Sequence, residues 1–388
     1  MRRILKFIPF IILIFLLIAF AKNRGASEVR APVITETTTQ SKEEPKLVLL
    51  TENGGRVDWY KGKAHNLIAF DAQVDSATRN TELYTIDPDT LEKFCVTCEN
   101  KDVPKGFIGQ PVWHPDGEHI IFQAESSFSN HTIFEHLAWG INNDLWIIKK
   151  DGTGAEKIWS TKENEAALHP HFNEKGDKII FSEKYPTGRK IKLLELLPVG
   201  TPGDENQWDG WHIHIADFEI SKPGLEKIYN NKNLFENNEG FYETHGFVND
   251  NEIIFSHTAD GKGYVDDIYT SNLDGSDLKN LINSPDTWDE HGLYSPNGKY
   301  FTFMSSRIDK FWRANKSKPL DLATELYIMD TKTNKTTQLT HMNDNVDLRH
   351  VVSDYDWNKD STKIVFEEGI TEDAIFNPKL PKIWILTL

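Results

Sequence analysis

A pattern of apolar and polar positions recurs six times along the chain. In the copy from Trp113 to Phe122, an aromatic residue is followed by a Pro-Asp-Gly turn and an apolar run that ends in phenylalanine. This order predicts an inner strand, a tight turn and a second, buried strand. The opening aromatic residues of the six copies are Trp59, Trp113, Phe172, Phe247, Tyr294 and Trp357, and the closing residues are Phe70, Phe122, Phe181, Phe255, Phe303 and Phe366.

Each copy continues with a third apolar strand and a shorter outer strand. In the second copy these are residues 145–148 and 156–159, with the turn signal Asp151-Gly152 between them. The second and third strands are apolar at nearly every position, which indicates that both faces of each sheet are covered. Four-stranded sheets stacked face to face around an axis meet this requirement. The repeat therefore predicts an all-β, six-bladed β-propeller of four-stranded blades, with the longest loops on one face.

The two ends of the repeat region complement each other. The sixth copy ends at Leu388 with its third strand, and an isolated apolar segment, Lys46–Thr51, precedes the first copy. That segment ends in Leu-Leu-Thr, which is similar to Gln338-Leu339-Thr340 at the end of the fifth outer strand. We expect the N-terminal strand to complete the sixth blade, because a closed ring has no exposed sheet edge to pair with other chains. An open solenoid of six units is the alternative.

The repeat resembles a known family. Trp113-His114-Pro115-Asp116-Gly117 followed by Ile120-Ile121-Phe122, and the later Leu326-Tyr327-Ile328-Met329-Asp330, are similar to the TolB-type β-propeller repeat. The resemblance covers residues 45–388 and implies the propeller fold. It implies no single function, since the family includes periplasmic binding scaffolds, the propellers of prolyl peptidases and stand-alone enzymes. The chain has no Gly-x-Ser-x-Gly motif, so the hydrolase chemistry of the peptidases is not expected.

The N-terminal residues favour export. Residues 1–21 combine a cationic start, an apolar run of about 15 residues and the sequence Ala19-Phe20-Ala21, which is typical of a signal peptide. An uncleaved membrane anchor is the alternative. Residues 22–44 are polar, which predicts a disordered linker before a single propeller domain of residues 45–388. The sequence thus predicts an exported protein, periplasmic or extracellular, whose only membrane attachment would be this N-terminal segment.

Net charge and cysteine content narrow the classes of partner. The formal net charge is −16 and no basic stripe interrupts it, so nucleic acid is excluded as a partner. Protein, carbohydrate and small-molecule ligands remain as possible partners.

Cys95 and Cys98 are the only cysteines, and a local disulfide is their expected state in an oxidising compartment. Free thiols and a redox role are the alternatives, whereas a metal site needs more ligands of this kind.

Histidines and acids occur at equivalent positions just before the opening aromatic residues. Three positions before them the chain has Arg56, Gln110, His169, Thr244, His291 and Asp354, and close to these are His171, Glu243, His245, Asp289 and Glu290. We place these residues where the chain crosses from one blade to the next, around the mouth of the central channel. Six units far apart in the sequence would then deliver imidazole and carboxylate groups to one small ring.

This ring has three possible roles. Imidazole and carboxylate groups favour one divalent transition metal (Zn, Mn, Fe or Ni), with His169, His171, His245 and His291 as candidate ligands. Other candidate residues of the pocket are Arg56, Gln110, Glu243, Asp289, Glu290 and Asp354. A metal-free ligand pocket and a purely structural ring of hydrogen-bonded residues remain open.

A more distant resemblance concerns the same residues. Oligogalacturonate lyases are related propellers that hold a metal through histidines and a glutamine at the channel mouth, and His169, His171, His245, His291 and Gln110 are similar to them in ligand type. That family has seven blades, so the resemblance implies ligand type only. Two functions follow. One is an exported TolB-like binding scaffold for a protein or small ligand, which a propeller without a further catalytic domain favours. The other is a metal-dependent lyase or hydrolase acting on a saccharide or small molecule.

Overall fold

The structure is a computed structural model that describes residues 45–131, 140–185, 210–236, 240–258, 265–308, 322–344, 349–370 and 380–388. The predicted signal segment and linker, residues 1–44, lie outside the described residues. Within the described ranges, no helix is both long and apolar enough to cross a membrane.

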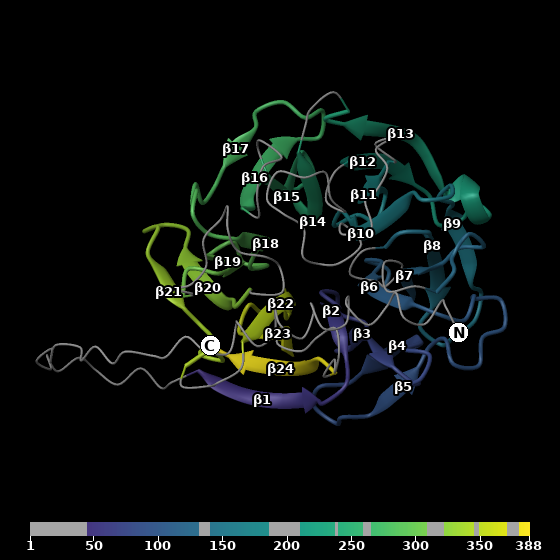
Figure 1. The fold of residues 1–388 in the computed structure, drawn as a ribbon, viewed down its shortest axis with the longest axis horizontal. Helices are drawn as coiled ribbons and strands as arrows, with labels where there is room; N and C mark the ends of the chain where they lie inside the picture. The colour runs from purple at the N-terminus through teal and green to yellow at the C-terminus, as the bar shows by residue number, and fades with distance from the viewer. Residues whose placement is uncertain are drawn as a thin grey trace, which may run out of the picture. The chain divides into compact units, whose positions relative to one another are not determined.

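Six four-stranded antiparallel sheets surround a common axis (Figure 1), which confirms the predicted all-β propeller. Blade 1 consists of β2 (Gly55–Trp59), β3 (Ile68–Gln73), β4 (Thr81–Ile86) and β5 (Lys93–Cys95), and blade 2 of β6 (Ile108–Trp113), β7 (His119–Glu125), β8 (Asn143–Lys149) and β9 (Glu156–Trp159). Blade 3 consists of β10 (Ala166–Phe172), β11 (Lys178–Lys184), β12 (Trp211–Phe218) and β13 (Ile228–Leu234), with a short 3-10 helix, η2 (Gly224–Lys227), before β13.

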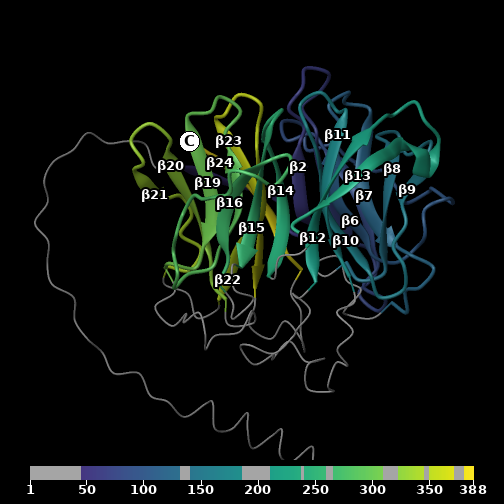
Figure 2. The ribbon, with the colours of Figure 1, turned by 90° about the horizontal axis from the view of Figure 1, so that it is seen from above.

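The other three blades repeat this order from the inside outwards. Blade 4 consists of β14 (Phe241–Asn249), β15 (Glu252–Thr258), β16 (Asp267–Asn272) and β17 (Lys279–Asn280), and blade 5 of β18 (Asp289–Tyr294), β19 (Tyr300–Ser305), β20 (Glu325–Asp330) and β21 (Thr336–Gln338). Blade 6 consists of β22 (His350–Trp357), β23 (Lys363–Ile370), β24 (Lys382–Thr387) and β1 (Lys46–Thr51). The first strand of each blade is the innermost and lies beside the first strands of its neighbours (Figures 1 and 2).

The ring is closed by the N-terminal strand, as the sequence predicts. β1 pairs antiparallel with β24, and the register places Lys46 opposite Thr387 and Leu49 opposite Trp384. Three strands of blade 6 therefore come from the C-terminal end of the chain and the fourth from the N-terminal end of the propeller. The alternative of an open solenoid is wrong.

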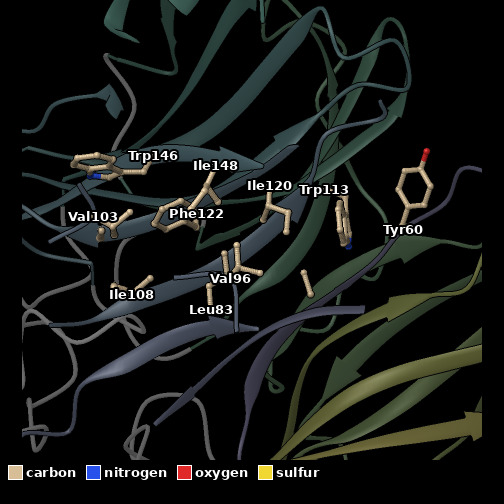
Figure 3. Packing of buried hydrophobic residues seen from close by; sticks show 12 residues of the cluster. Tyr60, Leu83, Val96, Val103, Ile108, Trp113, Ile120, Phe122, Trp146 and Ile148 are labelled. Atoms are coloured by element: carbon tan, nitrogen blue, oxygen red, sulfur yellow. The ribbon is translucent and has the colours of Figure 1, made fainter. Parts of the chain in front are cut away.

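The apolar core lies between the blades. In the cluster formed by blades 1 and 2, Leu83 meets Ile120, Phe122 and Ile148, and all four side chains are fully buried (Figure 3). The closing phenylalanines of all six copies have at most 1% of their surface exposed, which explains why the sequence repeats them. Each such side chain stabilises the fold by roughly 1.5–3 kcal/mol relative to an exposed position.

Each inner strand contains a bulge a few residues before its opening aromatic residue. The register shifts between Gly55 and Asp58 in β2, and shifts recur in β6, β10, β14, β18 and β22. In four of these strands, a non-glycine residue of the bulge has a positive φ: 42° at Arg56, 51° at Gln110, 47° at His169 and 53° at His291. Such a conformation costs about 1–3 kcal/mol and re-aims a side chain, and it is common at functional sites.

The bulges correct one detail of the sequence interpretation. The candidate residues were expected at the crossings between blades, but they lie within the inner strands themselves. In the sequence these residues look like a loop because they are polar. At a bulge, a side chain departs from the in–out alternation of its strand, so a polar residue can occur there.

The predicted disulfide is confirmed on blade 1, where Cys95 and Cys98 are bonded with a Cα–Cα distance of 5.7 Å.

Removal of β1 tests the closure of the ring. A chain that begins at Gly54 should unfold at a temperature roughly 5 °C or more below that of the full propeller, because it loses the backbone hydrogen bonds of one strand and exposes the edge of β24. Differential scanning calorimetry measures the difference. A chain that begins at Pro45 is the matched control and should melt as the full protein does. Equal melting temperatures for the two truncated chains would show that β1 does not hold the ring.

Candidate functional site

A pocket in the central channel receives residues from all six inner strands. Its volume is about 580 Å³, including the part that is open to solvent. Seven of the residues singled out in the sequence line it: Arg56, Gln110, His169, His171, His245, His291 and Asp354. The other lining residues are Val57, Asp58, Pro111, Val112, Leu293, Tyr355 and Asp356.

A polar link between successive blades positions these residues. The bulge removes the backbone N–H of the bulged residue from its own ladder, and a side chain of the preceding blade accepts it. In each of the following pairs, the backbone N–H of the first residue donates to the side-chain atom of the second: Arg56 and Glu367 Oε2 (2.8 Å), Gln110 and Asp71 Oδ2 (3.0 Å), His169 and Gln110 Oε1 (3.1 Å), Thr244 and Ser182 Oγ (2.9 Å), and His291 and His245 Nε2 (3.3 Å). The link recurs at five of the six blade junctions and fixes the height of each pocket residue in the channel.

Three histidines from three blades converge in the pocket. The ring centroids of His245 and His291 are 4.8 Å apart, those of His169 and His291 are 5.7 Å apart, and those of His169 and His245 are 6.3 Å apart. These residues are separated by 46 to 122 positions in the sequence, so only the ring of blades brings them together. The distances are short enough for the three side chains to reach one small ligand.

Glu243 joins this cluster without lining the pocket itself. Its carboxylate Oε1 lies 2.7 Å from Nε2 of His169, and Glu243, His245 and His291 offer ligand atoms that all lie within 4.8 Å of one another. Burial opposes the charge of Glu243, but His169 and the two other imidazoles hold its pKa well below the usual value. Burial also opposes protonation of His169, yet the pair with Glu243 raises the pKa of that imidazole. The result is a buried, ionised carboxylate among imidazoles.

Burial disfavours the charged form of the two other imidazoles of the cluster. Burial lowers the pKa of His245 well below its usual value, and the neighbouring His291 lowers it further. Burial also lowers the pKa of His291, against the pull of Asp354. The Nε2 atom of His245 accepts the backbone N–H of His291 and lies 2.6 Å from the hydroxyl of Ser256, which can donate to the same lone pair.

His171 presents an unused polar atom to the same pocket. Its Nε2 is buried and makes no hydrogen bond with the described residues, whereas the ring is bonded to the backbone of Thr244. The Nδ1–H group is thus the donor to Thr244, and Nε2 carries a lone pair. Burial and the neighbouring His169 lower the pKa of His171 to about 3, so that this lone pair persists at neutral pH.

On the opposite side of the pocket, Arg56 is held by Asp71. Its Nε and Nη2 atoms donate to the two carboxylate oxygens of Asp71, each at 2.7 Å. Burial opposes this charge, but Asp71 raises the pKa of Arg56 beyond its already high value. Asp71 also accepts the backbone N–H of Gln110, and Nε2 of Gln110 lies 3.3 Å from Nε2 of His169. The ion pair therefore supports the glutamine and, through it, the histidine cluster.

Three residues predicted for the pocket, Glu243, Asp289 and Glu290, are not among those that line it, and neither is Thr244 of the predicted ring. Thr244 donates its hydroxyl to the carbonyl of His169 at 2.7 Å and links blades 3 and 4. Asp289 is fully buried and pairs with Arg307 at 3.0 Å. Glu290 accepts the indole N–H of Trp288 at 2.8 Å, and burial together with Glu243 raises its pKa well above the usual value. These side chains support the wall of the pocket and do not face its interior.

Sequence reasoning missed two pocket carboxyl groups, Asp58 and Asp356. They precede the opening aromatic residue in blades 1 and 6, and this shared position was the signal available in the sequence. Asp58 accepts the N–H of Trp113 at 2.7 Å, and Asp356 accepts that of Trp59 at 2.6 Å. Burial and the adjacent Asp356 raise the pKa of Asp58 well above its usual value, which favours the protonated form of Asp58.

With this geometry in hand, the chain can be compared with known proteins. No family model matches it, and no curated protein matches it in sequence. Among solved structures it is similar to a putative TolB from Agrobacterium tumefaciens, with 14% identity over 74% of this chain and 81% of that chain and a TM-score of 0.47.

It is also similar to an oligogalacturonate lyase from Vibrio parahaemolyticus, with 12% identity over 91% of this chain and 96% of that chain and a TM-score of 0.48. A third similar structure is an oligogalacturonate lyase in complex with manganese, with 13% identity over 91% of this chain and 96% of that chain and a TM-score of 0.46. Both resemblances inferred from the sequence thus recur among solved structures. The likeness is one of fold, and the chemistry of this chain rests on its own residues.

The pH dependence of stability tests the electrostatics of the pocket wall. Burial raises the pKa of Glu367 to about 7, with Arg56 opposing the shift and Asp354 adding to it. Stability is therefore complete below the ordinary pKa of a glutamate and decreases as pH rises toward 7, because the unfolded state ionises first. Relative to Glu367→Gln, the wild type should lose on the order of 1–3 kcal/mol between pH 4.5 and 7.5.

Urea unfolding of both proteins at the two pH values measures this loss. Glu118→Gln, an exposed substitution, is the control and should follow the wild type. Parallel pH profiles for the wild type and Glu367→Gln would mean that Glu367 has the same pKa in the folded and unfolded states, so that its burial is fully compensated.

Proposed function

We propose that the protein binds a divalent transition metal in its central pocket and uses it in a lyase or hydrolase reaction on a saccharide or small molecule. The observation that carries this proposal is the convergence of Glu243, His245 and His291, whose ligand atoms lie within 4.8 Å of one another. Two imidazoles and one carboxylate suit zinc, manganese, iron or nickel.

The state of each group fits metal binding. A metal ligand must be a neutral imidazole or an ionised carboxylate, and the pKa values of His245 and His291 are lowered while that of Glu243 is also lowered. The ligands also have the supporting contacts that metal sites usually show. Ser256 orients His245, and His169 holds Glu243. In the part of the chain that the structure describes, this is the one such group of three.

The residues around the cluster supply the remaining parts of a reaction site. When bound, the ion would act as a Lewis acid on a substrate oxygen. His169 faces the pocket, and the pair with Glu243 raises its pKa, so this imidazole can hold a proton near neutral pH and release it to a ligand. Gln110 fixes the orientation of His169 through the contacts of its side chain with the backbone N–H and the ring.

Export of the protein belongs to the same proposal. The signal-like segment of residues 1–21 directs the chain out of the cytoplasm, and the Cys95–Cys98 disulfide is the state expected in an oxidising compartment. Both observations support a periplasmic or extracellular protein.

A metal-free binding scaffold is the second candidate, and a specific contact favours it. His169 and Glu243 already form an ion pair, so the centre of the cluster is partly compensated without a cation. In that case the pocket would recognise a protein segment or a small ligand through the same residues and would carry out no reaction.

Metal content discriminates between the two candidates. Protein purified without added metal should contain about one transition-metal ion per chain by mass spectrometry of the elements. His245→Ala and His291→Ala should each weaken metal binding roughly 10- to 100-fold, because each removes a ligand. The exposed His341→Ala is the matched control and should keep the metal.

Chelation provides a second measurement. Removal of the ion should lower the melting temperature of the wild type, because a ligand that binds only the folded state stabilises it. A metal-free protein whose melting temperature is the same in the wild type, His169→Ala and His291→Ala would favour the scaffold and exclude the metal-dependent enzyme.

A further inference from the structure

The pocket contains few free hydrogen-bond donors. Arg56 directs two of its donor groups at Asp71, and Lys61 next to the pocket binds Asp356 and the carbonyl of Trp59. The hydroxyl of Tyr355 donates to the carbonyl of His291. The strongest cationic and hydroxyl donors near the pocket are therefore already engaged by the protein.

Acceptors, by contrast, are left available. The carboxylate of Asp354 lines the pocket and makes no hydrogen bond or ion pair with any residue in the described ranges. Nε2 of His171 also lacks a partner among these residues, although it is buried. A buried acceptor without a donor costs about 1–3 kcal/mol, so Nε2 of His171 indicates a ligand that donates. The half-buried carboxylate of Asp354 offers further acceptor oxygens in the same pocket.

The electrostatic surroundings place Asp354 at the centre of this region. Its charge acts on Arg56, His169, His291 and Glu367. The adjacent carboxyl pair of Asp58 and Asp356 adds further acceptor oxygens to the same pocket. The two cations nearby, Arg56 and Lys61, are each paired with another aspartate, so neither forms an ion pair with Asp354.

We propose that the pocket selects a small ligand that carries a primary ammonium group, which binds Asp354, with neighbouring hydroxyl groups that donate to His171. An amino sugar has this chemistry. The inference rests on the proposed function in that it names the substrate class of the same pocket. It predicts weaker binding of polyuronates than of the amine, since Arg56 and His169, the cationic side chains among the described lining residues, are already paired with carboxylates.

Calorimetric titration of the full-length mature protein, loaded with Mn²⁺ or treated with a chelator, tests the proposal. The probes are the β-1,4-linked glucosamine dimer, its N-acetylated form and digalacturonate, with putrescine as an amine that lacks the sugar. The amine dimer should bind about tenfold or more tightly than the acetylated dimer, and digalacturonate should bind more weakly than the amine dimer. If putrescine binds as tightly as the amine dimer, the ammonium group alone accounts for recognition. If putrescine binds more weakly than the amine dimer, the sugar hydroxyl groups contribute as well.

Substitution of Asp354 tests whether this residue causes the preference for the amine dimer over the acetylated dimer. Asp354→Asn should reduce the affinity for the amine dimer about tenfold or more and leave that for the acetylated dimer unchanged. The exposed Asp277→Asn is the control and should bind as the wild type does. If Asp354→Asn loses Mn²⁺ and keeps the preference for the amine, Asp354 is a metal ligand and the proposal is wrong.

Titration of the wild-type protein with these probes tests the proposal even if a variant fails to fold. Equal affinity for the amine and acetylated dimers, or tighter binding of digalacturonate, overturns the proposal. The two proposals fail separately. Binding of Mn²⁺ without selective amine binding would leave the metal site and remove the ligand class. Selective amine binding by chelated protein that takes up no metal would keep the ligand class and remove the metal-dependent reaction.

Discussion

The propeller depends on a hydrogen bond that crosses from each blade to the next. A bulge in each inner strand turns a backbone N–H away from its own sheet, and at five junctions a polar side chain of the preceding blade accepts it. Burial of such a group without a partner would cost about 1–3 kcal/mol, so these acceptors are needed for folding. This requirement explains why Asp71 and Ser182 are polar although each has at most 2% of its surface exposed.

The same contacts tie the fold to the pocket. Gln110 and His245 each accept a backbone N–H from the next blade and also line the pocket. A substitution at either position therefore acts on the junction between two blades as well as on the ligand. The bulge that creates the free N–H also turns the side chain toward the channel, so one local deviation of the strand produces both the link and the site.

Charge in the channel is arranged in pairs that span different strands. Arg56 binds Asp71, Lys61 binds Asp356, and His169 binds Glu243. Burial raises the pKa values of Asp58, Glu290 and Glu367, although Lys61 opposes the shift at Asp58 and Arg56 opposes it at Glu367. The apolar contacts between blades, such as those around Phe122, stabilise the ring and allow a polar centre to be maintained.

The sequence by itself determined the fold. The recurrence of Trp113, Phe122 and their counterparts predicted six blades, and the isolated segment Lys46–Thr51 predicted the closure, because strand period and apolar pattern are local properties of a chain. It also identified seven residues of the pocket, since equivalent positions in a repeat occupy equivalent places around the axis. The pairing of Cys95 with Cys98 followed from their spacing and number.

The tertiary structure alone decided the chemistry of the centre. It placed the candidate residues at bulges within the inner strands, moved Asp289 and Glu290 behind the pocket, and added Asp58 and Asp356 to its lining. It also decided how acidic individual groups are, because His169 holds the pKa of Glu243 well below its usual value while burial raises that of Glu367 to about 7. The physical reason is that these properties arise from distances of a few ångströms between residues on different blades, and no local pattern in the sequence specifies them.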